Sequence, residues 1–224
     1  QIGGYGRKPG EMIWPSALAL DSAENLYLAD DSLQRITKWD RDGHLVTHWG
    51  TQGQRDGEFD GPSGLLFDVD DNMLLVDHRN NRIQRFTKEG KFINKWGSEG
   101  DGDGQFNLPW GITQDNHGYI YVADWGNERV QVLDPSGVFT TKLRGQATLT
   151  KWTEEFFSSN PDERDTRAVA NMYPSLPEHL RDPYNESSQT EPYFWGVMDL
   201  TLDADGRLFV TEFRRHRLQI YERD

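Results

Sequence analysis

The sequence has 224 residues and no cysteine, which excludes a disulfide framework, thiolate chemistry and any metal site built on Cys. It also lacks a run of 18 apolar residues, so we expect no membrane-spanning helix and no membrane partner. Basic residues are few, because 24 Lys and Arg face 37 Asp and Glu, giving a net charge of −13. Binding to a phosphate backbone needs clustered Lys and Arg, so this balance counts against nucleic acid.

Gln1 opens the sequence with neither Met nor a basic, apolar stretch, so we expect any targeting segment to have been removed or never to have been present. Bacterial secreted proteins often lack Cys as well, so composition leaves the compartment open. The length suffices for one sizeable core.

What the sequence does have is a repeat of 47 residues. One copy centres on Tyr121–Leu133, and related stretches at Val76–Phe86 and Leu28–Ile36 follow the same spacing toward the start of the chain. A fourth copy, Val210–Tyr221, lies 88 residues after the third. This interval is 41 residues too long, which predicts an insertion.

Each repeat is expected to form four short strands. In the third copy, apolar alternation and turn signals predict strands at Gly111–Asp115, Tyr119–Asp124, Glu128–Leu133 and Val138–Leu143. Four antiparallel strands per unit make one blade of a β-propeller, so the sequence predicts an all-β fold.

The repeated stretch Val-Ala-Asp-x-x-Asn-x-Arg-Val-Gln-Val around Ala123 resembles the NHL repeat of β-propellers, as do Gly-rich links such as Gly97–Pro109. The resemblance implies a toroid, commonly of six blades, whose central channel is lined by the first strand of each blade. We expect one domain, 1–224, of only about four NHL-type blades. The predicted repeats are 11–50, 58–97, 105–144 and 193–224, with an insertion at 146–192.

The repeat count leaves two interpretations open. The last blade is expected to lack its outer strand, because Asp224 aligns with Ser136, before a fourth strand begins. The chain is then either a portion of a longer six-bladed propeller or a small ring that closes with another chain. An open blade exposes a sheet edge, so self-association is a possible outcome.

Acidic and basic residues recur at the loop between the second and third strands. We expect them to pair or cap the loop as scaffold, because a catalytic residue is not usually needed once per blade. The pairs are Asp30 with Arg35, Asp77 with Arg82, Asp124 with Arg129 and Glu212 with Arg217.

The insertion breaks the strand pattern. Lys151–Phe157 has helical spacing, and a second helix is predicted from Pro161 to about Met172 with Asn160 as its cap. Three prolines, Pro174, Pro177 and Pro183, are expected to keep the following chain irregular. The segment should lie over or beside one mouth of the channel, either as decoration on a blade or as a lid or docking surface.

Two enzyme classes share the resemblance: peptide-amidating lyases and gluconolactonase-like hydrolases, whose metal ligands follow the blade proline. The matching residues here are Ser16, Ser63, Trp110 and Met198. None is His, Asn, Asp or Glu, which counts against both classes for these blades. We therefore assign no catalytic residue, metal or cofactor.

The candidate binding residues lie where the copies differ. Asp199 replaces a Gly or Ala and is expected to be a buried carboxylate in need of a partner. Trp and Arg are favoured in interface centres. The full set is Asp199, Trp110, Trp195, His78, Trp125, Phe213, Arg214, Arg215 and His216.

The leading hypothesis is a non-enzymatic scaffold that binds a protein, peptide or small ligand on the channel-mouth face covered by the insertion. The alternative is a metal-assisted lactonase- or lyase-like hydrolytic enzyme. Its ligands would come from blades outside this chain, or from Asp199 with His78.

Overall fold

The computed structural model describes residues 2–148 and 151–222, and its strands form four antiparallel sheets. The first three sheets have four strands each, and the last has three among the described residues. The strands are β1 Pro15–Leu20, β2 Leu26–Asp30, β3 Arg35–Trp39, β4 Leu45–Trp49, β5 Pro62–Phe67, β6 Met73–Asp77, β7 Arg82–Phe86, β8 Phe92–Trp96, β9 Pro109–Gln114, β10 Ile120–Asp124, β11 Arg129–Leu133, β12 Phe139–Leu143, β13 Val197–Leu202, β14 Leu208–Glu212 and β15 Arg217–Tyr221.

These sheets are the blades of a β-propeller. The strands of each blade pair in sequence order, from the inner strand (β1, β5, β9 or β13) outward. We number the blades 1 to 4 along the chain. The predicted fold class is confirmed, and the third repeat differs from its prediction by one or two residues at some strand ends. Blade 4 has no fourth strand within the described residues, as expected.

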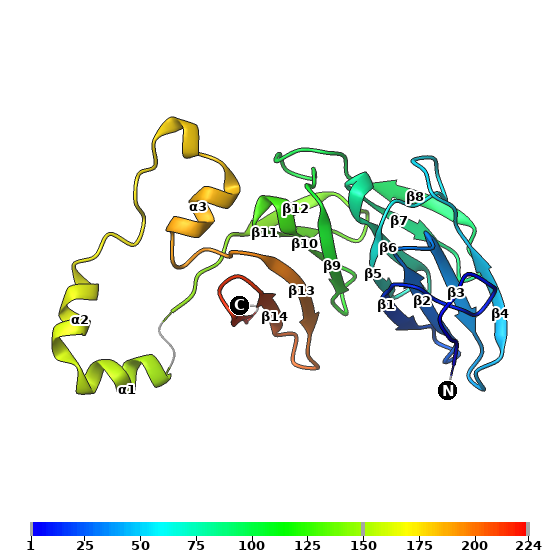
Figure 1. Ribbon diagram of the computed structural model, residues 1–224, viewed down its shortest axis with the longest axis horizontal. Helices are drawn as coiled ribbons and strands as arrows, with labels where there is room; N and C mark the ends of the chain where they lie inside the picture. Colours follow the sequence, from blue (N-terminus) through cyan, green and yellow to red (C-terminus); the bar gives the residue numbers. More distant parts are fainter. Residues whose placement is uncertain (1, 149–150, 223–224) are drawn as a thin grey trace.

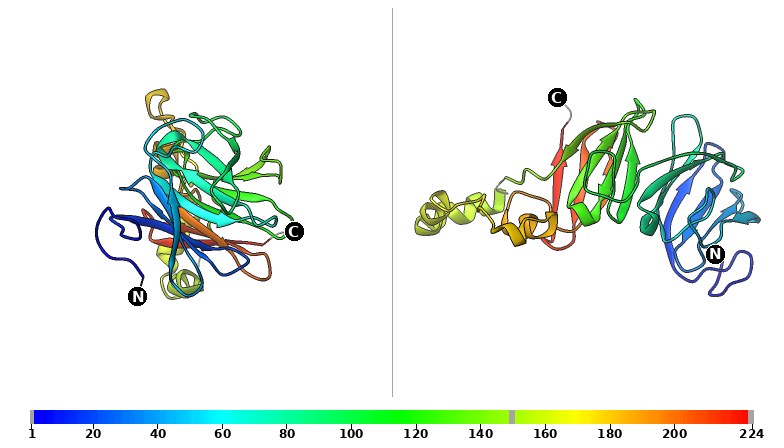
Figure 2. Two further views of the ribbon diagram at one scale, coloured as in Figure 1. Left: turned by 90° about the vertical axis from the view of Figure 1, so that its right-hand side faces the viewer. Right: turned by 90° about the horizontal axis from the view of Figure 1, so that it is seen from above.

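The blades form an open arc. Each inner strand packs against the next, β1 on β5, β5 on β9 and β9 on β13. Blades 1 and 4 lie at opposite ends of the row (Figures 1 and 2). Three hydrophobic clusters fill the spaces between successive blades, centred on Tyr27 with Phe86, Leu74 with Phe106, and Val130 with Phe194.

Glycine allows the inner strands to approach closely. A Cβ on Gly64 would lie 2.6 Å from the carbonyl oxygen of Trp110, and one on Gly111 would lie 2.9 Å from that of Met198. Neither backbone atom can move without displacing a strand. These two positions therefore set the spacing of blades 2, 3 and 4.

The insertion contains α1 Lys151–Ser159, α2 Pro161–Ala168, the short 3₁₀ turn η3 Glu178–Leu180, and α3 Pro183–Gln189. Helices α1 and α2 extend away from the blades, whereas α3 lies beside blade 4 (Figure 1). It contacts the 3₁₀ turn η2, Trp125–Asn127, of blade 3; blade 2 has a matching turn, η1, at His78–Asn80. No described helix combines the length and apolar character needed to cross a membrane.

Three details of the insertion correct the sequence prediction. Helix α2 ends at Ala168 rather than near Met172; it buries no residue, so packing does not extend it. Asn160 is at the N-cap position of α2, as predicted, but its side chain makes no capping hydrogen bond and its amide donates to the carbonyl of Phe156 at 2.8 Å. Pro183 does not keep the chain irregular but occupies the first turn of α3, where its missing N–H costs nothing.

Candidate functional site

The acidic residue that ends each second strand anchors a hydrogen-bond network. In blade 3, Asp124 accepts from Arg129 Nε at 2.7 Å, Gln131 Nε2 at 3.0 Å and Asn127 Nδ2 at 2.9 Å. Arg129 also donates to three carbonyls of the preceding link. Links and loops therefore share one face, which we call the mouth face. Equivalent ion pairs join Asp77 to Arg82 and Glu212 to Arg217.

Blade 1 departs from this pattern. The expected ion pair between Asp30 and Arg35 is not formed. Arg35 donates instead to the carbonyls of residues 7, 8 and 11, and Asp30 accepts from the N–H groups of Ile13 and Leu33. Thr37 stands where the other blades have Gln, so one donor to the carboxylate is missing. The structural role predicted for the recurring residues is thus confirmed in three blades and altered in the first.

A left-handed residue recurs in the same loop of all four blades, and in blades 1 to 3 its side chain binds the next blade. Gln34, Asn81, Glu128 and His216 have φ values of 52°, 53°, 51° and 49°. Gln34 accepts from Gly61 N at 2.7 Å, Asn81 from Leu108 N at 2.7 Å, and Glu128 from Gly196 N at 2.5 Å. We call this position the blade latch. His216 occupies it in blade 4 and is exposed.

Three blade-latch residues hydrogen-bond to the next blade: Gln34, Asn81 and Glu128. Of these three, Glu128 has an ionisable side chain. Its side chain is buried, and burial raises its pKa to about 7, while the N–H groups of Gly196 and Val197 and the nearby Arg214 oppose the shift. The carboxyl group at the junction of blades 3 and 4 is therefore partly neutral near pH 7.

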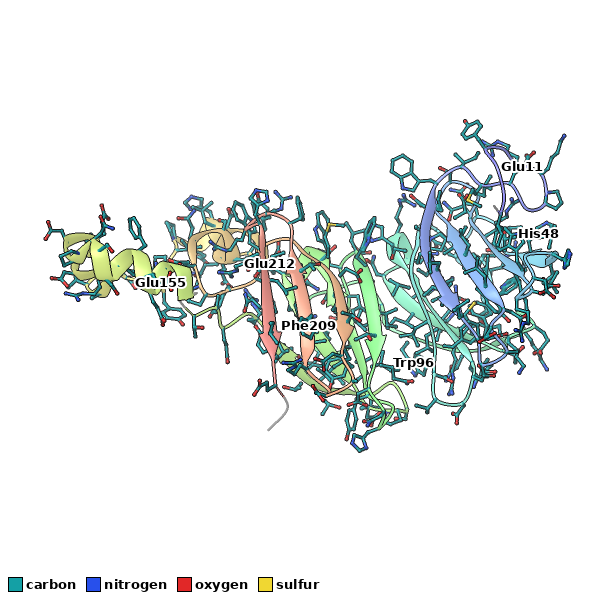
Figure 3. The ribbon with its side chains drawn as sticks, turned by 90° about the horizontal axis from the view of Figure 1, so that it is seen from below. Glu11, His48, Trp96, Glu155, Phe209 and Glu212 are labelled. Carbon is teal, nitrogen blue, oxygen red and sulfur yellow. The ribbon has the colours of Figure 1, made fainter. Side chains whose placement is uncertain are left out.

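Five side chains gather on the mouth face of blade 4. The guanidinium carbon of Arg214 lies 4.9 Å from the ring centroid of Phe213, 5.0 Å from that of Tyr184 and 5.8 Å from that of Trp195. Arg215 lies 5.6 Å from the Trp195 ring. We call this group the arginine cluster. It is built around the end of β14, where Figure 3 labels Glu212, and Tyr184 comes from α3.

Several polar atoms in and beside the arginine cluster are buried without a hydrogen-bond partner among the described residues. They are Nε of Arg214, Nε of Arg215, Nε1 of Trp195 and Oγ of Ser187. Arg215 reaches α3 through its other nitrogen, donating from Nη2 to the carbonyls of Ser187 at 2.6 Å and Thr190 at 3.1 Å. A buried donor without an acceptor costs about 1–3 kcal/mol, so the cluster holds hydrogen-bonding capacity that the protein itself does not use.

The predicted site residues separate into two groups. Trp195, Phe213, Arg214 and Arg215 meet in the arginine cluster. His78 instead lies near Trp110, with ring centroids 4.8 Å apart, and its Nδ1 is 3.0 Å from the carbonyl oxygen of Pro109. Burial lowers the pKa of His78, which favours the neutral imidazole. Trp125 lies half-buried in η2, the turn that α3 contacts.

Asp199 contradicts its prediction. It was expected to be buried, but its side chain is exposed, because no described blade covers β13 on its open side. Among the described residues, its Oδ1 accepts a hydrogen bond only from the adjacent N–H of Leu200, at 2.9 Å. The carboxylate therefore needs no buried partner.

Three residues of the site were missed from the sequence. Glu128 could have been found, because alignment of the repeats places a carboxyl where two copies carry Gln34 and Asn81. Tyr184 and Ser187 belong to the insertion, which has no second copy for comparison.

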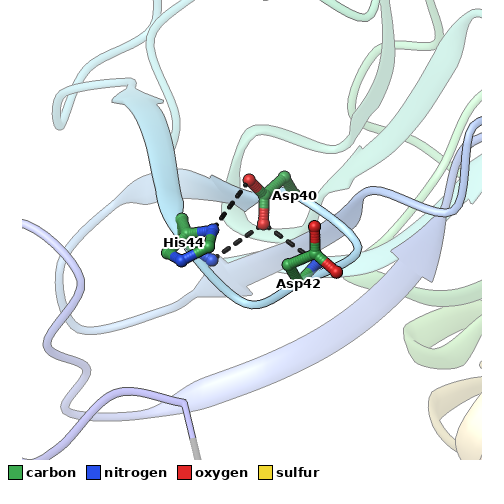
Figure 4. A group of neighbouring side chains, drawn as sticks. All are labelled: Asp40, Asp42 and His44. Carbon is green, nitrogen blue, oxygen red and sulfur yellow. Dashed lines mark hydrogen bonds and ion pairs between the residues drawn. The ribbon is translucent and has the colours of Figure 1, made fainter.

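The described residues contain one group of three side chains that could hold a metal ion: Asp40, Asp42 and His44 (Figure 4). These residues form the outer hairpin turn of blade 1. Oδ1 of Asp40 accepts from the N–H groups of Asp42 at 3.0 Å and His44 at 2.8 Å. Asp134 holds the equivalent turn of blade 3 in the same way. The arrangement is that of a turn stabilised by its own carboxylate.

The residues that follow the blade prolines have structural contacts. Ser16 donates to the carbonyl of Pro62 at 2.5 Å, and Ser63 donates to that of Trp110 at 2.9 Å. Both hydroxyls therefore join one inner strand to the next.

Comparisons with known proteins agree with this architecture. The model of the NHL repeat matches residues 106–133. The comparison with curated proteins gave no match. Among solved structures, virginiamycin B lyase from Staphylococcus aureus is 13% identical with a TM-score of 0.55, over 92% of this chain and 50% of that one.

Two further solved structures are similar. A protein of unknown function from Bacteroides thetaiotaomicron is 20% identical with a TM-score of 0.62, over 92% of this chain and 46% of that one. A chain of a nidogen/laminin complex is 16% identical with a TM-score of 0.54, over 92% and 58%. The chain thus spans roughly half the length of these neighbours, and the likeness concerns the fold. The blade architecture and these neighbours show a β-propeller fold, in which residues 106–133 match the NHL repeat.

Proposed function

We propose that the mouth face of blade 4 binds a protein or peptide partner through a carboxylate of that partner. The observation that carries the proposal is the unused hydrogen-bonding capacity of the arginine cluster, where Arg214 and Arg215 flank Trp195. A carboxylate offers up to four acceptor positions, and guanidinium groups bind it with charge-assisted hydrogen bonds.

The composition of the cluster favours a macromolecular partner. Trp, Tyr and Arg are the residues most often found at the energetic centres of protein interfaces. Cavities of about 530 and 660 Å³ exist elsewhere, one between the turns of blades 3 and 4 and one beside β15. The arginine cluster lies on the mouth face, next to helix α3 of the insertion. Small molecules are usually bound in enclosed pockets, so this surface suits a peptide segment better.

Local contacts rather than overall charge would decide the affinity. The net charge of −13 repels an acidic partner at long range. Salt at about 0.15 M screens such repulsion beyond about 8 Å but weakens partly buried pairs much less. Two buried carboxyls lie near the cluster. Glu128 accepts from the N–H groups of Gly196 and Val197, and Glu212 is paired with Arg217, so neither neutralises the cluster fully.

The enzymatic alternative has less support. The likeness to virginiamycin B lyase, at 13% identity, concerns the fold. Ser16 and Ser63 are engaged with neighbouring carbonyls, His78 Nδ1 lies against that of Pro109, and Asp199 is on the open side of β13. Lactone and ester hydrolysis, assayed with and without a chelator, tests this alternative directly.

Calorimetric titration tests the binding proposal. The probe is acetyl-tetraglutamyl-amide, and the matched peptide is acetyl-tetraglutaminyl-amide. We expect only the acidic peptide to bind, and Arg214→Ala to weaken it about tenfold, as for loss of a charged hydrogen bond. Arg41→Ala, which removes an Arg 69% exposed on the outer hairpin of blade 1, is the control. Equal binding of the two peptides, or unchanged affinity in Arg214→Ala, would count against the proposal.

A further inference from the structure

Blade 2 carries an arginine at the same repeat position as Arg214. This residue, Arg79, is likewise the second after the acidic residue that ends the second strand. Its guanidinium binds the carboxylate of Asp31 from the preceding blade, with Nη1 2.7 Å from Oδ1 and Nη2 3.0 Å from Oδ2. Oδ1 of Asp60 lies 3.3 Å from Nη1 of Arg79 as well. The junction of blades 1 and 2 thus shows how an arginine at this position holds a carboxylate in two parallel hydrogen bonds on the mouth face.

Both arginines lie over a glycine that immediately precedes the inner strand of their blade. A Cβ on Gly61 would clash with the guanidinium of Arg79 and lie 3.2 Å from Oδ1 of Asp31. A Cβ on Gly196, the matching residue of blade 4, would lie 2.8 Å from Cγ of Arg214. A side chain at either glycine would therefore displace the arginine. Blades 2 and 4 leave the same space free for this residue.

Blade 4 keeps the arginine, but tryptophans replace both aspartates. Trp125 of blade 3 stands at the repeat position of Asp31, and Trp195 stands at that of Asp60. Blade 3 is described in full, so the comparison with blade 1 is complete. Within the part of the chain that the structure describes, no carboxylate forms an ion pair with Arg214. The junction of blades 3 and 4 therefore retains the arginine and lacks the internal carboxylate that occupies it in blade 2.

Exposed aromatic rings surround the guanidinium of Arg214. The ring centroids of Phe213 and Tyr184 lie 4.9 and 5.0 Å from its central carbon, and these side chains are 45% and 42% exposed. Trp195 is half-buried, and its Nε1 has no acceptor among the described residues. Removing apolar surface from water is favourable, so a bound carboxylate gains affinity if an apolar group lies next to it.

We infer, resting on the function proposed above, that the arginine cluster selects a partner segment in which an acidic side chain lies next to an aromatic one. The carboxylate takes the place on Arg214 that Asp31 has on Arg79. The aromatic side chain packs on the rings that are exposed around the guanidinium. The exchange of two aspartates for two tryptophans thus converts an internal ion pair into a site for an external carboxylate.

Three tetrapeptides test this selectivity by NMR titration, which detects weak binding. The probe is acetyl-Gly-Phe-Glu-Gly-amide; acetyl-Gly-Gly-Glu-Gly-amide lacks the ring, and acetyl-Gly-Phe-Gln-Gly-amide lacks the charge. We expect the probe to bind about tenfold or more tightly than either control, because ring burial and charge-assisted hydrogen bonds both contribute. Equal binding of the two Glu peptides would overturn the selectivity and leave the proposed function standing. Equal binding of the two Phe peptides would overturn both.

Two variants of the chain test where the carboxylate binds. Trp125→Asp restores the arrangement of blade 2, so the introduced carboxyl should pair with Arg214 inside the protein. It should weaken binding of the probe about tenfold or more relative to Trp125→Asn, which is of similar size and uncharged. Equal affinity of the two variants for the probe would overturn the inference.

The same pair of variants has a readout that needs no peptide. An ion pair with Arg214 lowers the pKa of the introduced carboxyl in the folded state. The stability that Trp125→Asp gains over Trp125→Asn should therefore be present at neutral pH and be lost as the pH falls from about 5 to about 3. Urea unfolding across this range measures the difference. A difference that does not change with pH would show that a carboxyl at this position does not reach Arg214, and would also overturn the inference.

Discussion

At the scale of single residues, the blade latch shows how one position takes on different roles. Gln34 and Asn81 hold the next blade with neutral amides, whereas Glu128 uses a buried carboxyl. A protonated carboxyl keeps a carbonyl oxygen that can accept the same N–H groups. Ionisation adds the cost of a buried charge, which the two hydrogen bonds offset only in part.

Replacing this carboxyl should change how stability depends on pH. The pKa of Glu128 is raised from 4.5 to about 7 in the folded protein. The neutral form therefore stabilises the fold fully below pH 4.5, and this stability is lost as pH rises toward 7. Between pH 5 and pH 8 the loss is about 2–3 kcal/mol in the free energy of unfolding. Urea unfolding should show this loss in the wild type and not in Glu128→Gln.

The reciprocal variant is Gln34→Glu, which places a carboxyl at the same latch in blade 1. It should gain a pH dependence of the same sign. A Glu128→Gln protein whose stability falls with pH as steeply as that of the wild type would show that Glu128 is not the group responsible.

At the scale of elements, the inner strands depend on the absence of a side chain at Gly111. A Cβ there would lie 2.5 Å from Oδ1 and 2.9 Å from Cα of Asp199. The carboxylate can rotate away, but the backbone of β13 cannot. The backbone of β13 thus sets how closely blades 3 and 4 can approach each other.

We expect Gly111→Ala to lower the free energy of unfolding by about 1–3 kcal/mol, because it overpacks the inner strands. Gly4→Ala is the control, since a Cβ there would meet no atom within 4 Å. Chemical denaturation of the two variants compares them directly. Equal stabilities would mean that the strands separate at little cost.

The elements were predictable where the repeat supplied several copies. Four copies of one pattern place the strands of each blade and predict the ion pairs of Asp77, Asp124 and Glu212. Helix α3 was not predictable, because its position depends on Arg215 reaching the carbonyls of Ser187 and Thr190. Arg215 stands where blades 2 and 3 use Asn80 and Asn127, and its longer side chain holds a helix instead of a link.

At the scale of the whole molecule, the open arc leaves one face of blade 4 without a neighbour. Leu218 is 49% exposed, whereas Ile83, at the same repeat position in blade 2, is fully buried. Ile83→Ala should therefore cost about 2–5 kcal/mol, and Leu218→Ala about 0.5 kcal/mol or less. Thermal or urea unfolding checks the pair. A large loss in Leu218→Ala would show that this face is covered in solution.

The same openness explains why part of the site could not be predicted. Asp199 aligns with Gly111, a position buried in blade 3, but in blade 4 nothing described covers it. Trp195, Phe213, Arg214 and Arg215 were found because they differ from the other copies. Their meeting with Tyr184 depends on how α3 folds back on blade 4, which the repeat does not specify.

The indole N–H of Trp195 reports most directly on the proposed binding site. Its proton–nitrogen resonance can be assigned by comparison with Trp195→Phe and followed by NMR during titration with acetyl-tetraglutamyl-amide. If Nε1 gains a carboxylate acceptor, the resonance should move downfield in a saturable manner. This shift should be absent with the glutamine peptide, and in Arg214→Ala it should need about tenfold more acidic peptide. A Trp195 resonance that stays in place while the acidic peptide binds would contradict the account.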